Sequence, residues 1–269
     1  MANSTLAQDY RSLARNHLDP AQSLLRGPDD DLMFVCLKLR QCIEALSYGL
    51  LVTYRHELTA SAMRSWTPRK VLDELETADP LANSSHEITI GFPEAEGSSR
   101  MILSDVDRRF SPRWANKAYN KLSSILHVPT PKILESRSEL SATEIRTQCA
   151  EYATYLEEIL ASGVWHFVSG RFLEFHCDCG FLIKRRAETT EIGADLECSE
   201  CQRQYRIASI VGPEVEVVPR MATWTCRECA TENKFSAHEL EENKQYECSR
   251  CKTAVVFTKT WTFRNLERG

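Results

Sequence analysis

Two cysteine-rich stretches decide the fold of the C-terminal part of this chain: residues 177–201 read CDCGFLIKRRAETTEIGADLECSEC, and residues 226–251 read CRECATENKFSAHELEENKQYECSRC. In each stretch a close pair of cysteines is followed, 18 residues later, by a second close pair. A tight loop between two cysteines turns both sulfur atoms to one side, and two such loops can build a tetrahedral four-sulfur site. The equal spacing indicates an internal duplication with a repeat of about 50 residues.

The cysteine spacing predicts two structural zinc ions, because four thiolates close the coordination shell of Zn²⁺ and leave no position for a substrate. The predicted ligands are Cys177, Cys179, Cys198 and Cys201 for one ion, and Cys226, Cys229, Cys248 and Cys251 for the other. Disulfide pairing and a rubredoxin-like iron site are the alternatives. The first pair has one spacer residue rather than two, and Gly180 follows it where such a loop often needs a residue without a Cβ.

Strand-like segments flank these loops, so we expect two tandem zinc ribbons, over residues 171–212 and 220–263. A unit of about 40 residues buries too little apolar surface to fold alone. Structural zinc supplies about 10–16 kcal/mol of apparent binding free energy in small zinc peptides. The ribbons have two interpretations: a protein-contact or structural role, or nucleic-acid contact through the basic run 184–186 and exposed aromatic residues such as Tyr205 or Trp224.

The first part of the chain, residues 1–165, is predicted to be a helical bundle with a β-hairpin inserted at about residues 87–103. Apolar residues recur at three- and four-residue intervals from Leu32, which predicts a helix of about 30 residues. Further helices are expected over residues 5–17, from Pro68, after Ser111, and after Ser141, where a capping box begins. The predicted fold class is therefore a multidomain α plus small β protein, with the helical bundle first and the tandem zinc ribbons second.

The composition of the 269 residues, 42% hydrophobic and 26% charged, is that of a globular protein. No apolar run is long enough to span a bilayer, and the N-terminal sequence has no secretory pattern, so we expect a cytoplasmic protein without membrane contact. In a reducing compartment the 11 cysteines should not form disulfides. Cys36, Cys42 and Cys149 lie on apolar helix stripes and are expected in the core.

The net charge of −5 excludes a strong, nonspecific nucleic-acid binder, but one segment carries a net positive charge. Between Arg100 and Lys132 there are seven basic and two acidic residues, which could hold phosphates. The candidate nucleic-acid contacts are Arg108, Arg109, Arg113 and Lys117. His127 lies at the predicted C-terminus of the same helix, where it is either an acid–base group or a histidine that hydrogen-bonds a carbonyl.

Two segments of the first domain, Leu39-Arg-Gln-Cys-Ile-Glu44 and Ala118-Tyr-Asn-Lys-Leu-Ser-Ser-Ile-Leu-His127, make residues 25–162 resemble HEPN-like helical domains. That superfamily is rich in RNases, toxins and phage-defence proteins. The resemblance implies a dimer whose metal-independent RNase centre uses an Arg and a His separated by four to six residues. In this chain Lys121 takes the place of the Arg and the apolar Leu122 follows it, a departure from the pattern. As an RNase, the chain would hold phosphate with Lys121 and use His127 as general acid and base.

The sequence therefore predicts a zinc-binding protein that recognises nucleic acid, RNA in preference to DNA. The HEPN resemblance adds the setting, a prokaryotic antiviral-defence or toxin-type system. Two alternatives stay open. One is a non-catalytic interaction module, in which the helical domain forms a homodimer and the ribbons bind another protein. The other is a metal-independent HEPN-type endoribonuclease.

Overall fold

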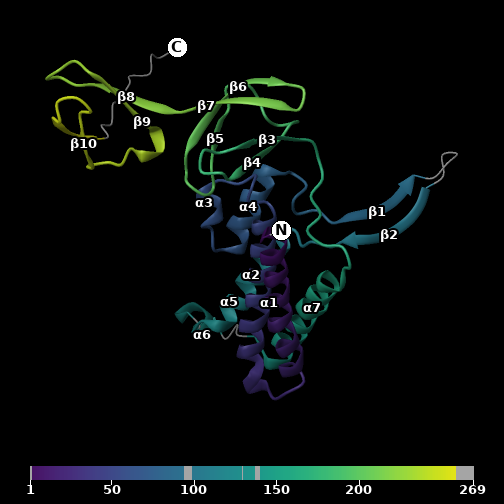
Figure 1. Cartoon of the computed structure of the whole chain (residues 1–269). Helices are drawn as coiled ribbons and strands as arrows, with labels where there is room; N and C mark the ends of the chain where they lie inside the picture. The colour runs from purple at the N-terminus through teal and green to yellow at the C-terminus, as the bar shows by residue number, and fades with distance from the viewer. Residues whose placement is uncertain (1, 94–98, 129, 137–139, 259–269) are drawn as a thin grey trace, which may run out of the picture. The chain divides into compact units, whose positions relative to one another are not determined.

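A computed structural model describes residues 2–93, 99–128, 130–136 and 140–258. The chain divides into two compact units, a helical unit that ends at Arg171 and a cysteine unit that begins at Phe172 (Figure 1). Helices make up most of the first unit and short antiparallel strands most of the second. The predicted mixed α and small β composition, with the helices N-terminal, is confirmed at this level. None of the described helices has the length and hydropathy that crossing a membrane requires.

The helical unit is built around one central helix. Its helices are α1 (Ala2–Leu24), α2 (Leu32–Thr53), α3 (Ala60–Met63), α4 (Pro68–Ala78), α5 (Pro112–Leu126), α6 (Pro131–Ser136) and α7 (Ala142–Ala161). Helix α2 contacts α1, α4, α5 and α7, and the side chains on its core-facing side, Leu39 and Ile43 among them, are fully buried. Cys36, Cys42 and Cys149 are also buried in this core, as their positions on apolar stripes predicted.

Two helix lengths differ from the prediction, and tertiary contacts explain both. Helix α1 continues through Pro20 because Leu18 and Ala21 are fully buried against the core. Helix α2 ends at Thr53, earlier than its apolar repeat suggested. The next residue, Tyr54, is buried and its hydroxyl donates a hydrogen bond to Asp79 at 2.8 Å, so the chain turns inward there.

The helix starts predicted after Ser111 and after Ser141 are confirmed, and a side chain caps each of them. The Ser111 hydroxyl accepts the N–H of Trp114 at the start of α5. At the start of α7, Ser141 and Glu144 form a complete capping box in which each side chain accepts the backbone N–H of the other. These contacts involve neighbours in the sequence, which is why the sequence alone locates them.

The expected hairpin consists of β1 (His86–Pro93) and β2 (Ser99–Asp107), and it extends away from the helices of its unit (Figure 1). The two strands are antiparallel, with Ile90 opposite Leu103 and a bulge directly after that pair. At the end of β2 the chain returns to the helical core through Phe110, which is buried. The hairpin therefore has one end rooted in the core and its other end outside it.

The cysteine unit consists of hairpins whose loops carry the cysteines. Its strands are β3 (Phe172–His176), β4 (Leu182–Arg186), β5 (Asp195–Glu197), β6 (Gln204–Val211), β7 (Glu214–Pro219), β8 (Met221–Thr225), β9 (Glu232–Ser236), β10 (Gln245–Glu247) and β11 (Ala254–Val256). Strand β3 pairs with β4, β8 with β9, and β10 with β11, while β5, β6 and β7 form a three-stranded sheet. The predicted end of the second ribbon at residue 263 lies outside the described residues.

The two halves of the cysteine unit differ in how much apolar surface they bury. The first half has a buried cluster formed by Cys177, Ile183, Leu196, Cys198, Tyr205 and Ile207. In the described part of the second half, residues 220–258, the buried side chains are those of Cys226, Asn233, Ser236 and Cys248. Phe235 and Tyr246 stack with ring centroids 5.2 Å apart but stay partly exposed. The second half therefore has no apolar core besides its cysteines among these residues.

Candidate metal centres

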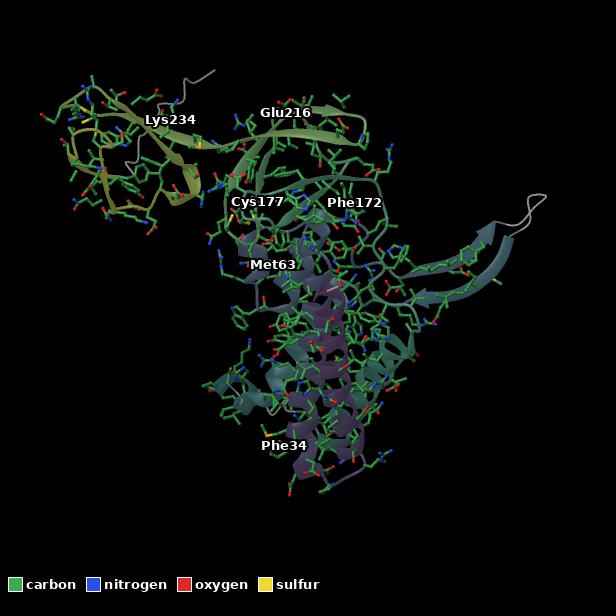
Figure 2. The ribbon with its side chains drawn as sticks, viewed as in Figure 1. Phe34, Met63, Phe172, Cys177, Glu216 and Lys234 are labelled. Carbon is green, nitrogen blue, oxygen red and sulfur yellow. The ribbon has the colours of Figure 1, made fainter. Side chains whose placement is uncertain are left out.

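The first cysteine cluster, Cys177, Cys179, Cys198 and Cys201, joins two hairpin loops. The first pair lies between β3 and β4, where Figure 2 labels Cys177, and the second pair lies between β5 and β6. The Sγ atoms of Cys177 and Cys201 are 3.5 Å apart, and those of Cys179 and Cys198 are 3.8 Å apart. All four sulfur atoms lie within 4.8 Å of one another.

The second cysteine cluster, Cys226, Cys229, Cys248 and Cys251, repeats this arrangement on β8–β9 and β10–β11. Its Sγ–Sγ distances are 3.5 Å between Cys226 and Cys251 and 3.6 Å between Cys229 and Cys248. The sequence repeat is therefore also a repeat of the site geometry.

The sulfur–sulfur distances fit a shared metal ion. Sulfur atoms at about 2.3 Å from a tetrahedral Zn²⁺ are about 3.8 Å apart, whereas a disulfide needs about 2.05 Å. The observed distances of 3.5–3.8 Å agree with the former and are too long for the latter. Both clusters are thus positioned to hold metal ions, each with four thiolate ligands.

All four cysteine loops close through the same backbone conformation. The residue after the second cysteine has a positive φ in each loop: +85° at Gly180, +64° at Gln202, +56° at Ala230 and +61° at Lys252. In the last three loops its N–H donates to the carbonyl of the first cysteine, four residues back. In the first loop Gly180 makes this bond over three residues, at 2.7 Å. The shorter spacer in Cys177-Asp-Cys179 therefore produces a tighter turn, at the one loop that has a glycine.

The substitution Ala230→Gly is expected to stabilise the metal-loaded protein by about 1 kcal/mol, because glycine removes the penalty of a Cβ in the left-handed region. A thermal unfolding transition of the second cluster would measure the gain. The matched control is Ala254→Gly in β11, where the extended backbone gives glycine no advantage and a loss of about 0.5–1 kcal/mol is expected. Equal losses at both positions would contradict the role of the loop conformation.

A tyrosine hydroxyl contacts the first cluster. The Tyr205 Oη lies 3.1 Å from the Sγ of Cys177 and accepts the N–H of Asp178, also at 3.1 Å. Burial alone would raise the pKa of Cys177, but hydrogen bonds from the Cys179 backbone and from Tyr205 lower it to about 7. The prediction that Tyr205 is an exposed aromatic for stacking on bases is wrong, because its side chain is only 2% exposed. The sequence did not predict that Tyr205 lies beside the sulfur atoms, because only the pairing of β6 with its neighbouring strands brings it there.

An asparagine takes a comparable place in the second cluster. The Asn233 side-chain N–H₂ donates to the Sγ of Cys248 at 3.7 Å, and its carbonyl oxygen accepts the N–H of Ser249 at 2.8 Å. Hydrogen bonding by the backbone of Cys251 lowers the pKa of Cys248 to about 6. Asn233 therefore fixes the position of the Cys248 loop and also supplies a polar contact to a sulfur.

In the helical unit, α5 presents a cationic outer face. Arg113 and Lys117 are exposed and one turn apart, and Lys121 follows one turn later, partly buried. The helix contains no acidic residue. Within the described part of the chain, no ion pair neutralises these three side chains, whereas Arg15, Arg40, Arg69 and Arg146 of the same unit each pair with a carboxylate. The predicted contact Arg108 is also exposed, just before α5.

The structure removes Arg109 from the predicted nucleic-acid contacts. Its side chain is 1% exposed and forms an ion pair with the equally buried Asp107, with Nε–Oδ2 and Nη2–Oδ2 distances of 3.0 and 2.5 Å. The guanidinium also donates to the carbonyls of Ala82 and Phe167, both at 2.6 Å. Asp107 in turn accepts the N–H of Phe167 at 2.8 Å. Arg109 therefore fastens the segment after α7 to the core and is not available to a ligand.

The candidate catalytic residues Lys121 and His127 lie near the end of α5. His127 is the exposed C-cap residue with extended backbone angles, while Lys121 lies within the helix. Within the described residues, no hydrogen bond or ion pair joins their side chains. The charge of Lys121 contributes to lowering the pKa of Glu144, after the hydrogen bonds from Ser141, so its ammonium group lies near the start of α7. Their joint catalytic role stays a prediction.

The basic run at residues 184–186 contacts its own hairpin, β3–β4. Lys184 donates to Glu174 at 2.6 Å across the β3–β4 pair, and its Nζ lies 5.5 Å from the ring centroid of Phe172. Arg186 lies over the same ring, at 5.2 Å. Both side chains therefore already interact with residues of the cysteine unit.

Comparison with known proteins gives no relative: no family model matches the chain, and neither a curated protein nor a solved structure does.

Proposed function

We propose that this chain is a zinc-stabilised RNA-binding protein, in which two zinc ribbons are structural and α5 contacts the phosphates. The argument for zinc is the donor set: four thiolates at tetrahedral spacing and no open position, which suits a structural ion and not a catalytic one. The first ribbon would span residues 171–212 and the second residues 220–263.

The observation that supports nucleic-acid binding is the cationic outer face of α5. Three basic side chains stand at successive turns, two of them exposed, in a helix without acidic residues and in a chain with a net charge of −5. A cation with no ion-pair partner is a better phosphate ligand than one already paired, because no existing contact has to be broken. Asn116 and Asn120 lie on the same helix and add hydrogen-bonding side chains. Arg108, Arg113, Lys117 and Lys121 are the proposed phosphate contacts.

The test is the salt dependence of RNA binding by the full chain. We expect a single-stranded RNA oligonucleotide, followed by fluorescence anisotropy, to bind at low salt and to dissociate as salt rises. The double substitution Arg113→Ala/Lys117→Ala should reduce the slope of log K against log salt by about 1.4, since each single-strand phosphate contact contributes about 0.7. Duplex DNA of equal length is the competitor that tests the preference for RNA.

The matched control is Arg69→Ala/Lys70→Ala, which removes the same charge from exposed positions of α4. This variant should keep the slope of the unsubstituted chain. Absence of RNA binding at low salt, or an equal change in both variants, would overturn the proposal.

The second candidate function is a non-catalytic interaction module, and the exposed apolar side chains of the β1–β2 hairpin favour it. In that case the ribbons would contact another protein and no RNA would bind. The antiviral-defence or toxin-type setting, and the RNase activity with Lys121 and His127, follow from the HEPN resemblance alone. Full RNA cleavage activity in His127→Ala would exclude that mechanism.

A further inference from the structure

Two cysteines of the helical core touch each other, although they are 113 positions apart in the sequence. The Sγ of Cys36 on α2 lies 3.6 Å from the Sγ of Cys149 on α7, and both side chains are fully buried. The third cysteine of this unit, Cys42, is equally buried later in α2, and within the described residues no other sulfur atom hydrogen-bonds to it. Cys36 and Cys149 therefore form a pair of thiols, and Cys42 provides a comparison.

A pair of thiols can undergo a reaction that a single buried thiol cannot. One buried cysteine serves in a core as a small apolar side chain. Two in van der Waals contact on different helices can also be oxidised to a disulfide. The S–S bond is about 2.05 Å long, so the two sulfur atoms would have to approach by about 1.6 Å. Rotation of the two side chains and a small shift of α7 are the movements that would close this gap.

We propose that Cys36 and Cys149 are a redox-sensitive pair, which a peroxide converts into a disulfide that ties α7 to α2. The Cys36 thiolate attacks one oxygen of hydrogen peroxide, the O–O bond breaks, and a sulfenic acid and hydroxide form. The Cys149 sulfur then attacks the sulfenic sulfur, the S–O bond breaks, and the oxygen leaves as water. Two thiols and one peroxide give one disulfide and two waters, which take up both thiol protons. Two electrons pass from the sulfur atoms to the peroxide.

The contact between the two sulfur atoms favours Cys36 as the group that attacks first. With Cys149 as the hydrogen-bond donor, this contact lowers the pKa of Cys36. The same contact raises the pKa of Cys149, as burial also does. Because the thiolate and not the thiol is the nucleophile, the cysteine with the lower pKa reacts with peroxide and the other one resolves the sulfenic acid.

The pair lies close to the end of the helical unit that carries the connection between α1 and α2. Cys36 is one turn after Leu32, where α2 begins, and Arg146 is one turn before Cys149 on α7. Arg146 pairs with Asp29 of that connection at 2.6 Å, and both of these side chains are partly exposed. An exposed ion pair stabilises little, so local opening at this end admits a molecule not much larger than water.

Peptide mapping of the full chain tests this proposal. The protein is treated with a molar excess of hydrogen peroxide, free thiols are then alkylated in denaturant, and the peptides are identified by mass spectrometry. We expect Cys36 and Cys149 in one cross-linked peptide pair that lacks two hydrogen atoms, and we expect Cys42 to be alkylated. Dithiothreitol should reverse the cross-link.

The oxidised helical unit should also unfold at a higher temperature than the reduced one. We expect a rise of about 5–10 °C in the midpoint, followed by helical circular dichroism, because the bond closes a long loop in the unfolded chain. A cross-link without any such rise would mean that the bond does not tie α7 to α2.

The matched variants are Cys149→Ala and Cys42→Ala, since each removes one buried thiol from the same core. The first should lose both the cross-link and the thermal shift, and the second should keep both. The peptide map of the unsubstituted chain decides the matter even where a variant folds poorly. Alkylation of Cys36 and Cys149 after peroxide treatment, or pairing of either with another cysteine, overturns the proposal.

Discussion

Replacing Cys248 by serine is expected to unfold the second half of the cysteine unit while the helical unit stays folded. The Cys248 side chain is fully buried, and it is one of only a few buried groups among residues 220–258. Structural zinc supplies about 10–16 kcal/mol in small zinc peptides, as much as the whole stability of an ordinary domain. With no apolar core to compensate, β8–β11 should lose their fold when the four-sulfur site is broken.

Three measurements check this expectation. Elemental analysis should show zinc falling from two ions to one per chain. Amide hydrogen exchange should become fast over β8–β11 and stay slow in α2. Cys198→Ser, in the first cluster, should also remove one ion, but Ile183, Leu196 and Ile207 remain there to hold a partly protected core.

The matched control is Ser249→Ala, next to Cys248. Its hydroxyl hydrogen-bonds the Asn233 carbonyl at 2.9 Å, and it does not belong to the four-cysteine cluster. Two ions and slow exchange should be retained in this variant. If Cys248→Ser kept both ions, or kept β8–β11 protected, the metal would not be what folds this half.

The second large effect is expected from Arg109→Ala, with a loss of about 3–5 kcal/mol in the free energy of unfolding of the helical unit. The substitution leaves the Asp107 carboxylate buried without its cation, and it removes the donors to the carbonyls of Ala82 and Phe167. An unpaired buried charge is far costlier than the net value of the pair. Urea unfolding, followed by helical circular dichroism, gives the measurement.

The neighbouring residue provides the control for this prediction. Arg108→Ala removes the same side chain from an exposed position and should change stability by no more than about 0.5 kcal/mol. The double substitution Arg109→Met/Asp107→Leu, which removes both charges, should recover much of the loss. A cost below about 1 kcal/mol for Arg109→Ala would mean that the ion pair does not hold the segment after α7.

The metal clusters could be predicted from the sequence because their information is local. Each cysteine pair lies in one tight loop, so the spacing alone places two sulfurs together, and the duplication of the 18-residue interval joins the loops in pairs. The starts of α5 and α7 are local in the same sense, since Ser111 and Ser141 contact backbone groups three residues away. The net charge and the basic segment could also be read from the sequence. The sequence did not show which cations of that segment are exposed and which are buried in an ion pair.

Only the tertiary structure separated Arg108 from Arg109. The two residues are adjacent and chemically identical, yet one is exposed and the other is buried beside Asp107, among carbonyls from distant parts of the chain. The same holds for Tyr205, which strand pairing brings to the Cys177 sulfur. Local spacing determines which atoms can meet within one loop, so the sequence alone identified the eight cysteines as candidate metal ligands. Whether a polar side chain faces water or the interior depends on partners far away along the chain. Only the tertiary structure could therefore show which of these side chains are buried.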